Sequence, residues 1–108
     1  MIDLKTLTVQ KAHESLKSGE YTVSDLAQAY IDVVKDKNTE INAYLEIFTS
    51  DIEMQVKKAQ EMFSNGTATL LTGIPIAIKD NILFEGHIAS ASSKILENHV
   101  AVYNAFVI

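Results

Sequence analysis

Apolar residues in the first part of the chain recur at the spacing of three and four residues that is typical of amphipathic helices. This pattern predicts helices at about residues 8–18, 24–37 and 51–64. Each predicted helix presents one apolar stripe to a core and a polar face to solvent. The residues that form the stripes are Val9, Ala12, Leu16, Leu26, Ala29, Tyr30, Val33, Ile52, Val56, Ala59 and Phe63.

Capping signals mark the ends of these helices. Thr22 and Asp25 have the spacing of a capping box, in which each side chain bonds to the backbone N–H of the other residue. Ser50 and Glu53 have the same spacing before the third helix. Gly19 follows the first helix, where a left-handed residue often ends a helix. These signals support the predicted helix boundaries.

Two other segments have patterns that are typical of strands. Residues 43–48 alternate with a period of two, and residues 74–79 form an isoleucine-rich run that predicts a strand buried on both faces. Because the helix at 51–64 lies between them, the order predicts one parallel βαβ unit. We therefore expect an α/β fold, with two or three helices and an incomplete parallel sheet.

Lys79 ends the second of these runs and is the candidate catalytic residue. In open α/β sheets, ligands bind in the crevice outside the carboxyl ends of the strands. A lysine shielded from water there loses its proton more easily and can act as a general base toward a serine hydroxyl. Alternatives stay open. Residues 79–81 can be a solvated turn that leaves a core strand. Asp80 can either supply turn hydrogen bonds together with Asn81 or hold Lys79 charged in an ion pair.

The composition excludes several classes of protein. The chain has 108 residues, 47% hydrophobic content and a formal net charge of -5, which argues against a basic face for nucleic acid. It has no cysteine, which excludes disulfide scaffolds and thiolate metal sites. His13, His87 and His99 lack neighbours at metal-ligand spacing, so we assign no metal site. No apolar run reaches the roughly 20 residues that span a bilayer, and we expect a cytoplasmic protein without a membrane segment.

Two blocks of sequence carry a resemblance to a known family. Residues 71–81 read Leu-Thr-Gly-Ile-Pro-Ile-Ala-Ile-Lys-Asp-Asn, and residues 93–98 read Ser-Lys-Ile-Leu-Glu-Asn. The first block resembles the amidase signature family. The second resembles, within that family, the A subunits of glutamyl-tRNA(Gln) amidotransferases. Residues 42–46 and 103–105 are similar to the same subunits, so the resemblance covers nearly the whole chain.

The resemblance implies a Ser-cisSer-Lys triad in which Lys79 is the catalytic lysine. It implies that such a subunit frees ammonia from glutamine. Partner subunits B and C then complete a transamidation that converts Glu-tRNA(Gln) to Gln-tRNA(Gln), and tRNA is contacted mainly through these partners. The assembled complex uses ATP and magnesium by the same resemblance, and we expect no cofactor-binding or metal-binding residue in this chain.

The chain also departs from the family pattern. Both triad serines of the family lie in glycine- and serine-rich segments downstream of the lysine, and this chain has four glycines and no such segment. Ser90, Ser92 and Ser93 are not assigned as nucleophiles, because small residues there serve packing and turns. The apolar end at 105–108 also favours a fragment. We therefore expect residues 1–108 to be the N-terminal fragment of an amidase signature domain, inactive alone. The alternatives are a fragment of another amidase and a non-catalytic truncated remnant.

Overall fold

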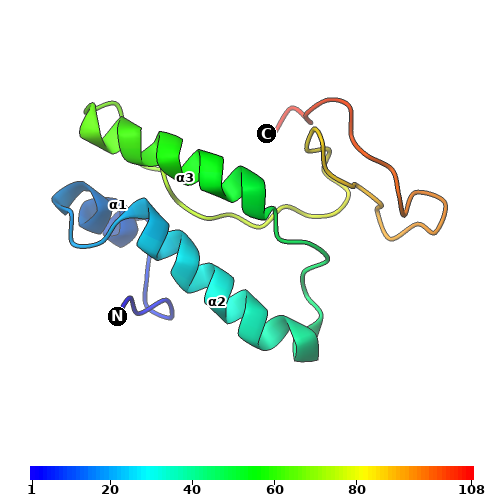
Figure 1. The fold of residues 1–108 in the computed structure, drawn as a ribbon, viewed down its shortest axis with the longest axis horizontal. Helices are drawn as coiled ribbons and strands as arrows, with labels where there is room; N and C mark the ends of the chain where they lie inside the picture. The colour runs from blue at the N-terminus through cyan, green and yellow to red at the C-terminus, as the bar shows by residue number, and fades with distance from the viewer. The chain divides into compact units, whose positions relative to one another are not determined.

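The computed structural model describes all 108 residues and contains three helices, α1 (Val9–Ser18), α2 (Val23–Ile41) and α3 (Thr49–Ser64) (Figure 1). The contacts within the chain divide it into two compact units, Met1–Pro75 and Ile76–Ile108. All three helices belong to the first unit. No helix of the structure has both the length and the apolarity that crossing a membrane requires.

The helix ends of the first unit follow from local sequence. The Thr8 side chain accepts a hydrogen bond from the Lys11 N–H at the start of α1, and Gly19 ends α1 with a left-handed φ of 79°. At the start of α2, the Thr22 hydroxyl accepts from the Asp25 N–H, and the Thr22 N–H donates to the Asp25 carboxylate at 2.9 Å. The predicted capping box at Thr22 is therefore confirmed.

The third helix begins differently from the prediction. Its first residue is Thr49, and Phe48 is the N-cap without a side-chain cap hydrogen bond. Ser50 therefore lies inside the helix, and the predicted capping box of Ser50 and Glu53 is wrong. The second helix also runs beyond residue 37, to Ile41.

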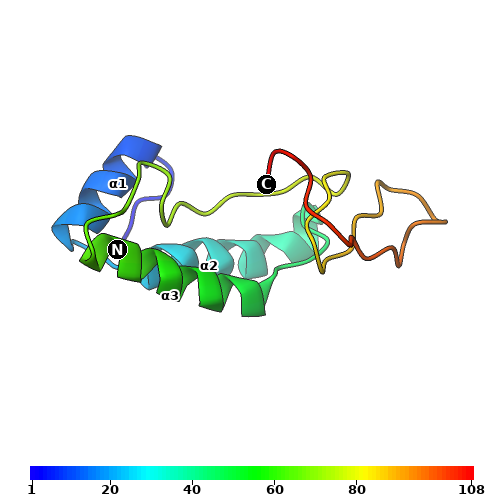
Figure 2. The same cartoon turned by 90° about the horizontal axis from the view of Figure 1, so that it is seen from above.

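Helices α2 and α3 form an antiparallel pair and pack against each other (Figures 1 and 2). The segment between them is a tight connection that starts at Asn42, which has a left-handed φ of 55°. The Asn38 side chain bonds to the Tyr44 backbone twice, donating to its carbonyl at 2.8 Å and accepting from its N–H at 2.7 Å. The backbone of Tyr44 in this connection therefore hydrogen-bonds to a side chain of α2 and not to a neighbouring strand.

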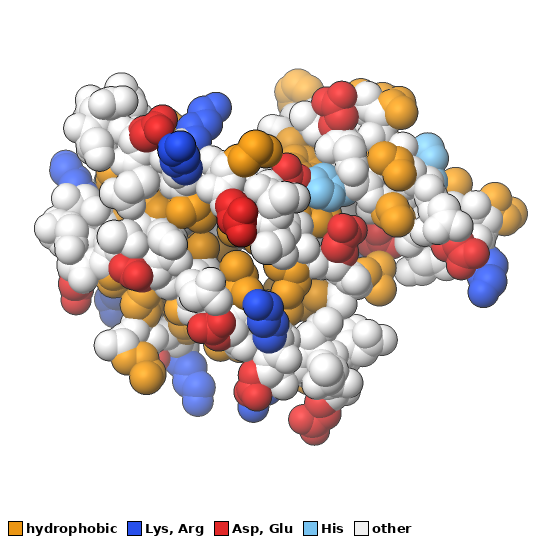
Figure 3. Space-filling view, in the orientation of Figure 1, with side chains coloured by type: hydrophobic (Ala, Val, Ile, Leu, Met, Phe, Trp, Pro, Cys, Tyr) orange, Lys and Arg blue, Asp and Glu red, His pale blue; other side chains and the backbone are white.

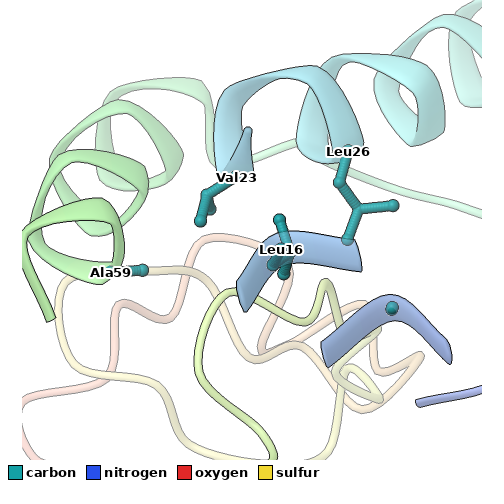
Figure 4. Packing of buried hydrophobic residues seen from close by; sticks show 5 residues of the cluster. Leu16, Val23, Leu26 and Ala59 are labelled. Atoms are coloured by element: carbon teal, nitrogen blue, oxygen red, sulfur yellow. The ribbon is translucent and has the colours of Figure 1, made fainter. Parts of the chain in front are cut away.

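The core of the first unit lies where the three helices meet. Figure 4 shows the side chains of Leu16, Val23 and Leu26 turned toward one another, with Ala59 facing them from α3. Leu26 is fully buried. The Gln60 side chain also accepts a hydrogen bond from the Val23 N–H at 3.1 Å, which ties the start of α2 to α3.

The expected α/β fold is wrong, because the structure contains no strand at 43–48 or at 74–79 and therefore no parallel βαβ unit. The only bridge is an isolated antiparallel one between Ile88 and Val100. A strand exists only with a neighbour that supplies its ladder of hydrogen bonds. The apolar run at 74–79 has strand composition, but it forms no bridge with residues 43–48 or with any other segment.

Candidate functional site

Lys79 lies in the second unit, at the first residue of a turn. The Ile82 N–H donates to the Lys79 carbonyl at 2.9 Å, which closes the turn. The Lys79 side chain is exposed. The expectation that a parallel sheet shields it is therefore wrong for these 108 residues. Its assignment as the catalytic lysine stays a prediction.

Asp80, the next residue, binds the segment that begins at Ser90. Its carboxylate accepts a hydrogen bond from the Ser90 hydroxyl and one from the Ser90 N–H at 3.1 Å. Its carbonyl accepts from the Ala91 N–H at 3.1 Å. The Ser90 hydroxyl and then the Ser90 N–H lower the pKa of Asp80, so the carboxylate is ionised at neutral pH. Of the two alternatives for Asp80, turn hydrogen bonding is the one that the structure contains.

The segment that Asp80 binds has an uncommon backbone. Ala91 and Ser92 have φ values of 50° and 59°, in the left-handed region that residues with a Cβ seldom adopt. The N–H groups of Ser92 and Ala91 also favour the charged form of Asp80 and so lower its pKa. The Asp80 carboxylate thus receives hydrogen bonds from a backbone that is bent around it.

A hairpin-like pairing supports this segment. The Ala101 N–H donates to the His87 carbonyl at 2.9 Å, and the Ala89 N–H donates to the His99 carbonyl at 3.0 Å. Ala89 and Ala101 are the buried residues of the second unit, with 6% and 2% of their surface exposed. Because Ser90 follows Ala89 directly, the contact between Asp80 and Ser90 joins the Lys79 turn to this pairing.

The structure brings some predicted residues together and leaves others apart. Ser90 and Ser92 lie at Asp80, where they stabilise a turn, in agreement with their interpretation as structural residues. The sequence predicted that Asp80 can form turn hydrogen bonds, but it did not identify Ser90 as the partner. The available signal was an Asp-Asn turn and a loop of small polar residues, but spacing cannot say which serine a carboxylate contacts.

No group of three or more histidine, cysteine or carboxylate side chains is positioned to hold a metal ion. His13 instead packs in the first unit, with its ring 5.8 Å from that of Phe63. His87 stacks on Phe84 in the second unit, with ring centroids 4.8 Å apart. Neither contact suggests a ligand site.

The model of the family described as Amidase matches residues 25–108. The chain therefore belongs to the amidase family, as the sequence resemblance predicted.

Curated relatives extend this result over the whole chain. The chain is 40% identical over 108 residues to the A subunit of the Thermoanaerobacter pseudethanolicus glutamyl-tRNA(Gln) amidotransferase, covering 99% of this chain and 22% of the relative. It is 40% identical over 107 residues to the same protein of Brachyspira hyodysenteriae, covering 96% and 22%. It is 38% identical over 107 residues to the A subunit of the Caldanaerobacter subterraneus enzyme, covering 99% of this chain and 22% of the relative. The chain thus spans about a fifth of the length of these relatives. No solved structure matches it.

Proposed function

We propose that residues 1–108 form the lysine-bearing N-terminal part of a glutamine-hydrolysing amidase, the A subunit of a glutamyl-tRNA(Gln) amidotransferase. The observation that carries the proposal is 40% identity to such a protein over nearly the whole chain. Lys79 is exposed within these 108 residues, so in this proposal the shielding that a base needs comes from segments outside them.

In this proposal Lys79 is the base of a serine nucleophile. Its unprotonated Nζ takes the hydroxyl proton of a serine that lies outside these 108 residues. The serine oxygen bonds to the carboxamide carbon of glutamine, and the C–N bond breaks as the nitrogen takes a proton and leaves as ammonia. Water then hydrolyses the acyl-enzyme, which releases glutamate and restores the serine.

Partners and cofactors follow from the relatives and not from the residues of this chain. We propose assembly with subunits B and C, which would use the ammonia in an ATP- and magnesium-dependent conversion of Glu-tRNA(Gln) to Gln-tRNA(Gln). By the same resemblance, ATP and magnesium belong to the assembled complex and not to any residue of this chain. No step of the ATP reaction is therefore assigned to these residues.

A chimeric enzyme tests the proposal. Residues 1–108 would replace the matching segment of the Thermoanaerobacter pseudethanolicus relative, co-expressed with the proteins with which that relative assembles, and ammonia release from glutamine would be measured. Lys79→Ala and Lys79→Arg are expected to lower kcat by about 100- to 10,000-fold, the contribution of a positioned base. The control Lys58→Ala, which changes an exposed lysine of α3, should keep the rate of the chimera.

Three results would contradict parts of this proposal. Full glutamine hydrolysis by Lys79→Ala would remove Lys79 from the mechanism. Hydrolysis of small aliphatic amides without glutamine hydrolysis would favour an amidase of another kind. Glutamine turnover by the isolated 108-residue chain, lost on Lys79→Ala, would show that no other segment is needed.

A further inference from the structure

The hydrogen bonds that hold the backbone at Lys79 involve the residues that follow it in the chain. Before it, Ile76 and Ala77 are exposed and belong to no strand. After it, Asp80 bonds to Ser90 through both its carboxylate oxygens and to Ala91 through its carbonyl. The position of Lys79 relative to the rest of the second unit therefore depends on the residue that follows it.

The carboxylate of Asp80 suits this task better than a neutral side chain. Both of its oxygens accept, one from the Ser90 N–H and the other from the Ser90 hydroxyl. An asparagine at this position keeps one acceptor and replaces the other with an NH₂ group, which cannot accept from the Ser90 hydroxyl or N–H and can only donate to the Ser90 oxygen. The charged, doubly accepting contact that helps to hold the left-handed backbone at Ala91 and Ser92 is then weakened.

We propose that Asp80 is a positioning residue for Lys79: by holding the 90–92 segment against the 79–82 turn, it fixes where the lysine amine meets its serine. This inference rests on the proposed function, because it assumes that Lys79 is the base. Asp80 itself touches no reacting atom in this arrangement. Its effect passes through the backbone to the adjacent residue.

The consequence for catalysis is a specific kinetic signature. A displacement of about 1 Å at a reacting group can lower a rate by about 100-fold. Loss of the Asp80 contact should therefore lower kcat, whereas KM for glutamine should change little, since the proposal gives Asp80, whose carboxylate is bonded to Ser90, no role in binding the substrate. A merely destabilised enzyme would instead lose active protein with kcat per folded molecule unchanged.

The experiment uses the chimeric enzyme in its complex, with kcat and KM for glutamine measured per active site and hydrogen exchange measured over residues 88–94. Asp80→Asn is expected to lower kcat by about 100-fold and to speed exchange over this segment. Ser90→Ala should also lower kcat and speed exchange. Ser90→Thr, which keeps the hydroxyl, should have the kcat of the unchanged chimera. The double variant Asp80→Asn with Ser90→Ala should have about the same kcat as Asp80→Asn, because both changes act on the same contact between Asp80 and Ser90.

Glu97→Gln is the matched control, since it makes the same carboxylate-to-amide change at an exposed residue of the same unit. It should leave both kcat and exchange unchanged. The proposal is overturned if Asp80→Asn speeds exchange but keeps kcat, or if the effects of Asp80→Asn and Ser90→Ala simply multiply. If the proposed function is wrong, the Lys79→Ala chimera stays active, which is a different result. Hydrogen exchange over residues 88–94 still tests the contact between Asp80 and Ser90 in that case.

Discussion

At the scale of single residues, Gly73 shows how the block at 71–81 also serves the core. Gly73 has a φ of 77°, and a Cβ added to it would lie 3.0 Å from Val23 Cγ2 and 3.4 Å from Leu16 Cδ1. These two side chains belong to the core of the first unit. A side chain at Gly73 would therefore contact Val23 more tightly than most Cβ atoms contact a neighbour, and Val23 would have to shift.

Gly73→Ala should destabilise the first unit for two reasons, left-handed strain and crowding against Val23. We expect the free energy of unfolding to fall by about 1–3 kcal/mol. Urea unfolding followed by circular dichroism at 222 nm measures this, because all three helices lie in this unit.

Gly66→Ala is the matched control for this change. Gly66 has a similar φ of 71°, but an added Cβ would meet nothing within 4 Å. It therefore reports the strain alone, and Gly73→Ala should cost more. Equal losses for the two variants would show that the close approach to Val23 contributes nothing.

The sequence identified Lys79 as a candidate residue but did not determine its surroundings. Its place at the end of an apolar run and the resemblance to amidases identified it as a candidate. Its exposure matches the alternative of a solvated turn at 79–81. Periodicity could not choose between the two interpretations, because a run such as Ile74–Ile78 is buried only where other segments cover it. The partner of Asp80 was hidden for the same reason, since Ser90 lies ten residues further along the chain.

At the scale of elements, the starts of α2 and α3 provide a direct comparison of two similar sequence signals. Thr22 caps α2 through its hydroxyl, whereas Ser50 lies within α3 and caps nothing. Both were predicted from the same spacing to a carboxylate residue. The structure therefore predicts that removing the Thr22 hydroxyl lowers the free energy of unfolding more than removing the Ser50 hydroxyl does.

Thr22→Ala should lower the free energy of unfolding by about 1 kcal/mol, because the Asp25 N–H loses its acceptor at the start of the helix. Ser50→Ala should cost less, since alanine favours a helix interior and no cap is lost. The same urea unfolding measurement compares the two variants. A larger loss for Ser50→Ala would show that Ser50, and not Phe48, is the residue that caps α3.

The difference between helices and strands explains which elements were predictable. A helix forms its hydrogen bonds within one segment, so the stripes at Leu16, Leu26 and Ala59 were enough to indicate all three. A strand needs a second segment, and residues 43–48 are instead held by Asn38 between two packed helices. The alternation at 43–48 therefore predicted neither the backbone's partners nor the burial, since Leu45 on the predicted apolar face is 74% exposed.

At the scale of the whole molecule, the two units differ in how much apolar surface they bury. The first unit has a shared core from three helices. In the second, only Ala89 and Ala101 are buried, whereas Ile95 is 94% exposed and Ile76 is 78% exposed. Figure 3 shows apolar side chains at the surface among charged ones. Large exposed apolar surface favours association with another surface.

The isolated chain should therefore bind a hydrophobic dye and self-associate as its concentration rises, and the second unit should be responsible. Ile95→Ser with Phe106→Ser should lower both dye fluorescence and the mass measured by sedimentation, because both side chains are exposed in the second unit. Met54→Ser is the control, since Met54 is 66% exposed on α3 of the first unit. Equal effects of the control and the double change would place the association elsewhere. A monomer with a sharp thermal transition and no dye binding would show that the second unit is stable with its apolar side chains in water.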